Sequence, residues 1–191
     1  MVQAQRAKKS SKPKKKAAPA INEIKVTFDD TVGEGGEMFP VGNMTVTPAE
    51  GAPIDAGPVT GGRAKHILTH PGSHTVTHKK GAKGMSGEFG VPVPFAIYFY
   101  KGEAVHVGSV NSGSHACVHN GNRALMEKVN GRTVPGKTKV VIEYEGDTLK
   151  KLTEAQAAFK AAEKARKEAE AKAKAEAKKA AAAEKKAKKK P

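Results

Sequence analysis

The sequence has few of the residues that cross-link a protein or anchor it in a membrane. It contains one cysteine, no tryptophan and 5% aromatic residues in 191 positions. A single cysteine excludes an intramolecular disulfide and a cysteine-rich zinc site, and it leaves the redox compartment open. No segment approaches the roughly 18 to 20 apolar residues of a membrane span. The apolar run 17–21 is also shorter than a signal-peptide core of about 7 to 15 residues, so the sequence shows no export signal.

Acidic residues are missing from one end of the chain and outnumbered at the other. Residues 1–20 carry seven Lys or Arg and no acidic residue, and residues 151–191 carry fourteen Lys or Arg against six acidic residues. Residues 21–150 have thirteen of each, so the net charge of +15 belongs to the two ends. We divide the chain into a disordered basic tail (1–20), a domain (21–150) and a basic Ala/Lys-rich helical tail (151–191). Basic ends favour anionic partners such as nucleic acid, wall polymers or anionic lipid head groups.

The domain has the patterns of a mainly β fold. Apolar and polar residues alternate from 24 to 28, which is the period of a half-buried strand. The apolar run 95–100 predicts a central strand, and Lys101-Gly102 predicts a tight turn into a second strand at 104–107. Further strands are predicted at 44–47, 59–60, 64–68, 73–78 and 138–144, and a short helix is predicted after Cys117, with Asn120 or Asn122 as its cap.

A long helix is predicted at the C-terminal end. Thr153 and Gln156 have the spacing of a capping box, which predicts a helix start at Thr153. From there to about residue 190 the sequence is almost entirely Ala, Lys and Glu, which are strong helix formers with many i,i+4 pairs. The segment has no heptad stripe of apolar residues, so we expect a solvated single helix and not a coiled coil.

Four histidines recur at every fourth position: His66, His70, His74 and His78. On a helix this spacing would place four imidazoles on one metal-binding face. Pro71-Gly72 interrupts the row with a turn, however, and no acidic residue between 63 and 87 supplies a further ligand. We interpret the four as surface or groove-lining histidines and expect no metal or other cofactor. A His-rich metal-binding domain is the alternative.

The stretch 95–119 holds the residues best suited to chemistry. It contains Cys117 and three of the seven histidines, His106, His115 and His119. The thiolate is the reactive form of cysteine, and a neighbouring imidazole can take the thiol proton. His106 is predicted at a strand end, and the Gly/Ser loop that follows can return Cys117 to its imidazole. The alternative interpretation is a small buried cysteine with incidental histidines.

The residues just before the cysteine suit an oxyanion site. Small residues at 112–116 allow a substrate backbone to approach closely. If a helix starts near Cys117, the N–H groups of Ala116 and Cys117 lie near its N-terminus. Peptide dipoles there favour a thiolate and a developing oxyanion.

This stretch resembles the catalytic core of the L,D-transpeptidase family (YkuD domain). The family's pattern is a histidine at a strand end, a variable loop, then Ser/Thr-His-Gly-Cys, an aliphatic residue, and Arg or Asn. Here it reads His106, a loop to Gly113, and Ser-His-Ala-Cys-Val-His at 114–119. Upstream, THPGSHTV at 69–76 is similar to the family's Thr-Pro-x-Gly and Thr-Val motif, and 92–99 is similar to the strand before the histidine. The resemblance covers about residues 57–145 and explains neither tail.

Two residues depart from the family pattern. Ala116 stands where glycine is usual. If that position needs a positive φ, alanine costs about 1 kcal/mol or more and alters the oxyanion geometry. His119 stands where Arg or Asn is usual, which changes a hydrogen bond to the loop.

The resemblance implies a role for each residue of the site. Cys117 would be the nucleophile and His106 its base, held by a nearby backbone carbonyl, that of Val107. His115 would support the cysteine loop from beside the nucleophile. The backbone N–H groups of Ala116 and Cys117 would stabilise the oxyanion. The remaining residues of the predicted site are Ser114, Ala116 and Val107 in the oxyanion loop, and His119 and Tyr98 as substrate contacts.

The resemblance also implies a fold and a reaction. The fold is a mainly β, L,D-transpeptidase-like sandwich with one short helix after the cysteine, followed by the long C-terminal helix. The thiolate attacks the L,D-peptide bond of a peptidoglycan tetrapeptide stem, releases D-alanine and forms a thioester. An amine then takes the acyl group to give a 3→3 cross-link, or water takes it, as in an L,D-carboxypeptidase.

Partners and location follow from the same resemblance. The stem peptide of peptidoglycan is the implied partner, and the cell envelope or periplasm is the implied location. The missing export signal conflicts with that location and leaves three alternatives: a truncated or misassigned start, unconventional export, or release by lysis, as would suit a phage-encoded enzyme. The alternative hypothesis is a nucleic-acid-associated or structural protein that uses its basic tails and carries a degenerate catalytic domain.

Overall fold

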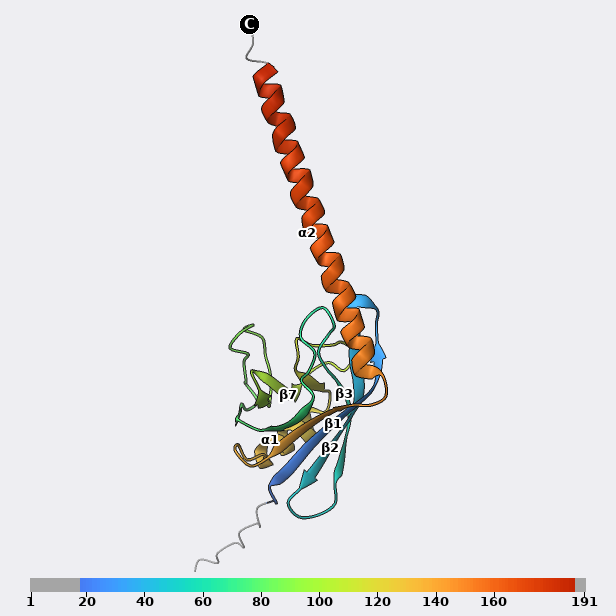
Figure 1. Cartoon of the computed structure of the whole chain (residues 1–191). Coiled ribbons are helices and arrows are strands. Elements are labelled where there is room, and N and C mark those ends of the chain that lie inside the picture. The colour runs from blue at the N-terminus through green and yellow to red at the C-terminus, as the bar shows by residue number, and fades with distance from the viewer. Residues whose placement is uncertain (1–17, 188–191) are drawn as a thin grey trace, which may run out of the picture.

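The computed structural model describes residues 18–187, with side chains described to residue 181. Residues 1–17, most of the predicted disordered tail, lie outside the described residues. The fold is mainly β, as predicted (Figure 1). In the described residues, nine strands form one hydrogen-bonded sheet in the order β4-β9-β1-β2-β3-β8-β7-β6-β5. The elements are β1 (Ile21–Val32), η1 (Gly35–Glu37), β2 (Phe39–Pro48), β3 (Ile54–Thr60), β4 (Gly72–Thr75), β5 (His78–Lys79), β6 (Ile97–Tyr100), β7 (Glu103–Val107), β8 (Val118–Asn120), α1 (Arg123–Arg132), β9 (Lys139–Tyr144) and α2 (Thr148–Ala187).

The first strand organises one half of the sheet. β1 pairs antiparallel with β2 and parallel with β9. Its alternating residues Ile24, Val26 and Phe28 have no exposed surface. Side chains of a strand point to opposite faces in turn, so these three enter the core together, as the alternation predicts.

The other half of the sheet carries the candidate site. β6 and β7 form the predicted hairpin, and β8 joins β7 in parallel. β4 and β6 contact each other although they are far apart in the strand order, so the sheet curls around a shared core. The two layers expected of a sandwich are therefore halves of one curled sheet. The core includes Ile24 and Met44 from one half and Phe99 and Val105 from the other.

Two local predictions near the site are wrong. Residues 64–68 do not form a strand but begin with a turn, in which the His66 N–H donates to the Arg63 carbonyl (3.0 Å). The short helix predicted after Cys117 is present as α1, but it does not start at the cysteine, because β8 follows Cys117 directly and α1 begins only at Arg123. The dipole of a helix acts within its first turn, so it does not act on the cysteine. Asn122 is the cap of α1, and its side chain accepts from the Leu125 N–H (3.0 Å).

The long C-terminal helix is present but begins earlier than predicted. α2 starts at Thr148, and Thr153 lies inside it, where its hydroxyl donates to the Leu149 and Lys150 carbonyls. The predicted capping box at Thr153 is therefore wrong. Leu152 is fully buried under the first turns, and beyond them the helix extends away from the sheet (Figure 1). Residues 164–181 of this part are exposed. Within residues 18–187, no helix is long and apolar enough to cross a membrane.

Candidate active site

Two neighbouring parallel strands bring Cys117 and His106 to one face of the sheet. Val105 of β7 pairs with Val118 of β8, and both are fully buried in the core. The next pair is His106 with His119, which the alternation places on the opposite face. Cys117 immediately precedes β8 and packs beside Ala104 of β7, two positions before His106. The predicted nucleophile and base thus lie on adjacent chain segments.

The His106 ring is oriented by its own strand end. Its Nδ1 lies 2.9 Å from the Val107 carbonyl oxygen, which is the partner that the family resemblance implies. A carbonyl oxygen only accepts, so Nδ1 carries the proton, and Nε2 of the neutral ring keeps its lone pair. Burial lowers the pKa of His106 to about 4, with a smaller contribution from His119. The imidazole is therefore neutral at pH 7 and able to accept a proton.

The Cys117 thiol sits in largely apolar surroundings. It packs against a small cluster made by Val93, Ala96, Tyr98 and Ala104. Burial raises the pKa of the thiol, and the negative charge of Glu103 adds to that shift, while the backbone of Ala104 opposes it. The resting state at neutral pH is a thiol, so a reaction of Cys117 requires a base to remove its proton.

The residue before the cysteine has a backbone conformation that favours glycine. Ala116 has φ of +131°, which L residues rarely adopt. The departure from the family pattern at this position therefore falls where the backbone needs glycine. The Ala116 N–H donates to the Ser114 hydroxyl (3.0 Å), and that hydroxyl donates to the Cys117 carbonyl (2.6 Å). Of the two predicted oxyanion donors, the Ala116 N–H is thus already paired inside the loop.

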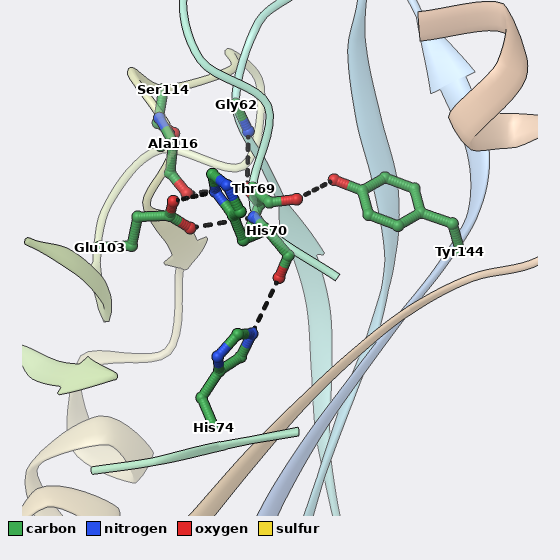
Figure 2. A network of polar contacts seen from close by, with 8 residues as sticks. All are labelled: Gly62, Thr69, His70, His74, Glu103, Ser114, Ala116 and Tyr144. Carbon is green, nitrogen blue, oxygen red and sulfur yellow. Dashed lines mark hydrogen bonds and ion pairs between the residues drawn. The ribbon is translucent and has the colours of Figure 1, made fainter. Parts of the chain in front are cut away.

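A buried threonine holds the other side of the same loop. The Thr69 hydroxyl donates to the Ala116 carbonyl (2.8 Å) and accepts from the Gly62 N–H (3.0 Å) (Figure 2). Thr69 has no exposed surface, and its own carbonyl accepts from the Tyr144 hydroxyl (2.8 Å). The sequence singled out Thr69 only as part of the 69–76 motif. Its contact with Ala116 spans 47 residues, which no local pattern reveals.

The next residue, His70, is bound twice by one buried carboxylate. Glu103 accepts from the His70 backbone N–H (3.0 Å) and pairs with His70 Nδ1 (2.7 Å) (Figure 2). Its side chain is 7% exposed, whereas that of His70 is 44% exposed. Burial raises the pKa of Glu103, and the two bonds from His70 oppose that shift. Glu103 is a residue that the sequence analysis did not single out.

The four regularly spaced histidines do not converge. His66 stacks on the exposed ring of His115 (centroids 3.7 Å apart), which also lies near Phe89 (4.9 Å). His70 binds Glu103, His74 Nε2 contacts the His70 carbonyl (3.3 Å), and His78 stacks on Tyr98 (4.2 Å). In the part of the chain that the structure describes, no group of three or more His, Cys, Asp or Glu could hold a metal ion.

The remaining predicted site residues have defined neighbours. His119 Nδ1 contacts the Ser109 carbonyl (3.0 Å) in the loop between His106 and Cys117, and its ring lies edge-on to that of His106 (4.8 Å). His119 thus makes a loop contact, at the position where the family has Arg or Asn. Tyr98 is 8% exposed and belongs to the cluster on which Cys117 packs.

No family model matches the sequence, and no curated protein sequence matches it. An L,D-transpeptidase from Stackebrandtia nassauensis is similar in structure, with 21% identity over 64% of this chain and 57% of that chain and a TM-score of 0.46. An L,D-transpeptidase from Mycobacterium tuberculosis gives 18% identity over 65% and 58% of the two chains and a TM-score of 0.45. One from Xylanimonas cellulosilytica gives 20% identity over 69% and 64% and a TM-score of 0.37.

Proposed function

We propose that this protein is a cysteine-dependent acyltransferase of the L,D-transpeptidase type. The observation that carries the proposal is the state of His106. Its Nδ1 is tied to the Val107 carbonyl (2.9 Å), its ring is neutral, and it shares a sheet face with Cys117. A thiol with a raised pKa needs such a base. The match of 114–119 to the family pattern supplies the class of substrate.

The proposed reaction has two acyl-transfer steps. His106 takes the Cys117 proton, and the thiolate adds to the carbonyl of the L,D-peptide bond of a tetrapeptide stem. The C–N bond breaks, the imidazolium returns the proton to the leaving amine, and D-alanine departs, which leaves a thioester on Cys117. An amine of a second stem attacks the thioester and restores the thiol, giving a 3→3 cross-link. If water attacks instead, the product is a tripeptide stem, and the protein is an L,D-carboxypeptidase.

Product analysis tests this proposal. The full chain is incubated with a disaccharide-tetrapeptide, and the muropeptides are separated by liquid chromatography and identified by mass. We expect release of D-alanine with a 3→3 dimer or a tripeptide, no product with Cys117→Ser, and a rate reduced by at least about 100-fold with His106→Ala. A wild-type protein that is folded by circular dichroism but yields no product would contradict the proposal.

A second candidate function, binding of nucleic acid, is favoured by one feature of α2. Five lysines at spacings of 4, 3, 7 and 4 residues recur on one face of the helix, because these spacings are close to whole turns. This face runs for roughly 27 Å at 1.5 Å per residue. Two of its lysines, Lys164 and Lys167, pair with Glu168 (4.0 Å) and Glu163 (2.8 Å) at its border. All five side chains are exposed, and we name them the lysine stripe: Lys160, Lys164, Lys167, Lys174 and Lys178.

A matched pair of variants tests the second candidate. One replaces the five lysines of the stripe by Gln, and the other replaces five basic residues elsewhere on α2, so both have the same net charge. Binding to duplex DNA of arbitrary sequence is measured as a function of salt. We expect the stripe variant to lose most of the affinity and the salt slope. Equal losses in both variants would show that only net charge matters. The control positions are Lys150, Lys151, Arg166, Lys172 and Lys179.

A further inference from the structure

The direction of the Cys117 N–H is set by a residue far away in the sequence. The Ala116 carbonyl and the Cys117 N–H belong to one peptide group, and residues 18–187 contain no cis peptide bond. In a trans peptide the C=O and the N–H point in opposite directions. Thr69 binds that carbonyl (2.8 Å), so the Cys117 N–H points away from Thr69.

Of the two predicted oxyanion donors, the Cys117 N–H is the one that can bind an oxyanion. The Ala116 N–H is committed to the Ser114 hydroxyl (3.0 Å). Ser114 itself is fixed by its N–H on the Gly61 carbonyl (2.9 Å) and by its carbonyl, which accepts from the Arg63 N–H (3.0 Å). An oxyanion that forms when the thiolate adds to a carbonyl is therefore served by the Cys117 N–H, whose direction depends on Thr69.

Thr69 is in turn held from three sides. The Gly62 N–H donates to its hydroxyl, the Tyr144 hydroxyl donates to its carbonyl, and Glu103 binds both the backbone and the ring of the adjacent His70 (Figure 2). The Tyr144 and Glu103 contacts come from β9 and β7, two different parts of the sheet. The hydroxyl of Thr69 thus has one donor and one acceptor at fixed positions in a fully buried site.

We propose that Thr69 is a positioning residue that aims the Cys117 N–H at the oxyanion of the acyl-transfer step, with Glu103 and Tyr144 holding Thr69 in place. The proposal rests on the proposed function in requiring Cys117 to act as an acyl acceptor. It does not depend on the natural substrate. An activated ester such as p-nitrophenyl acetate is enough to probe it: the thiolate adds to the ester carbonyl, an oxyanion forms, and p-nitrophenolate leaves as the thioester forms.

Two reactions of the same thiol separate positioning from general damage. Acylation by p-nitrophenyl acetate passes through an oxyanion, whereas alkylation by iodoacetamide displaces iodide without one. Both rates are measured on the full chain over a pH series, with Cys117→Ser as the background. For Thr69→Val we expect acylation to fall by about 100-fold, the effect of losing one oxyanion donor, while alkylation changes by less than about threefold.

Three further variants keep the test decisive. Thr69→Ser, which retains the hydroxyl, should restore acylation to near the wild-type rate. Thr133→Val removes another buried threonine hydroxyl, which donates to the Val129 carbonyl (2.8 Å) on α1, and should change neither rate. Tyr144→Phe tests the same proposal if Thr69→Val fails to fold. It should lower the acylation rate but not the alkylation rate, and by a smaller factor than is expected for Thr69→Val.

The outcomes distinguish this proposal from the proposed function. A parallel fall of acylation and alkylation in Thr69→Val, or no fall in either, would overturn the positioning role. So would a wild-type protein whose acylation does not exceed the Cys117→Ser background. If p-nitrophenyl acetate reacts as expected but the disaccharide-tetrapeptide does not, the positioning role stands and the peptidoglycan function fails.

Discussion

Replacing Ala116 by glycine tests the backbone of the site without touching its chemistry. The residue holds φ of +131° and is 5% exposed. Glycine adopts positive φ without a steric penalty. The substitution therefore removes strain from the native state and also removes one buried methyl group.

The expected effect follows from three contributions to the free energy of unfolding. Relief of a sparsely populated backbone conformation stabilises by about 1 to 3 kcal/mol. Loss of a buried methyl group destabilises by about 0.8 kcal/mol, and the added freedom of the unfolded chain destabilises by a further 0.5 to 1 kcal/mol or so. The net change for Ala116→Gly therefore lies between a destabilisation of about 0.8 kcal/mol and a stabilisation of about 1.7 kcal/mol.

A matched alanine isolates the strain. Ala56 lies in β3, is 3% exposed and does not have a positive φ. Ala56→Gly should lose the methyl group and gain chain freedom with no relief of strain, so it should destabilise by about 1.5 kcal/mol. The two variants should thus differ by about 1 to 3 kcal/mol in urea unfolding followed by far-ultraviolet circular dichroism. If Ala116→Gly destabilises as much as Ala56→Gly, position 116 is not strained and the reasoning fails.

Three further predictions concern titration and packing. Because His106 has a pKa of about 4 when folded and an ordinary value of 6.5, the unfolded state alone binds its proton between those values, and stability falls as pH drops through that window. Between pH 7.5 and 4, the free energy of unfolding in urea should therefore fall by about 3 kcal/mol less in His106→Gln than in the wild type. Equal falls in the two proteins would contradict the lowered pKa of His106. Glu103→Gln should lower the pKa of Cys117, read from the pH dependence of iodoacetamide alkylation; an unchanged or higher value would contradict the charge effect. Gly62→Ala should destabilise by about 1 to 3 kcal/mol, because a Cβ there would lie 2.0 Å from the Ile67 carbonyl oxygen, whereas Gly87→Ala, which meets open space, should change stability little. Equal stability of these two alanine variants would show that the backbone at Gly62 is not closely packed.

Features of the site that depend on neighbours in sequence could be predicted. The resemblance implied that His106 is held by Val107, and the two residues are adjacent at the end of one strand. The mainly β fold, the hairpin of β6 and β7 and the cap at Asn122 likewise follow from local alternation and turn residues. The doubt about Ala116 also came from the sequence, through the pattern that the stretch 114–119 resembles.

Features that depend on long-range contacts could not be predicted. Thr69 reaches Ala116 across 47 residues, and Glu103 reaches His70 across 33. No periodicity records such pairs, because each depends on how the sheet curls. The same limit explains the wrong helix start, since only packing of the first turns on the sheet reveals that α2 begins before Thr153.

Tertiary contacts also explain the errors at 64–68 and at Cys117. A segment of five residues is too short for its pattern to separate strand from turn, and here the N–H groups of Ala64 and Lys65 bind the Met38 and Gly36 carbonyls around η1. After Cys117, residues 118–120 pair in parallel with β7 and form β8, so the helix begins only after them. In both places the partner segment decides the local structure.

The most direct test of the central claim is the intact mass of the protein after exposure to an acyl donor. The full chain is mixed with a disaccharide-tetrapeptide or with a carbapenem, quenched in acid, and analysed by mass spectrometry with peptide mapping. The account predicts an acyl adduct on Cys117 that is absent in Cys117→Ser and forms far more slowly in His106→Ala. A folded wild-type protein that carries no adduct, or carries it on another residue, would contradict the account.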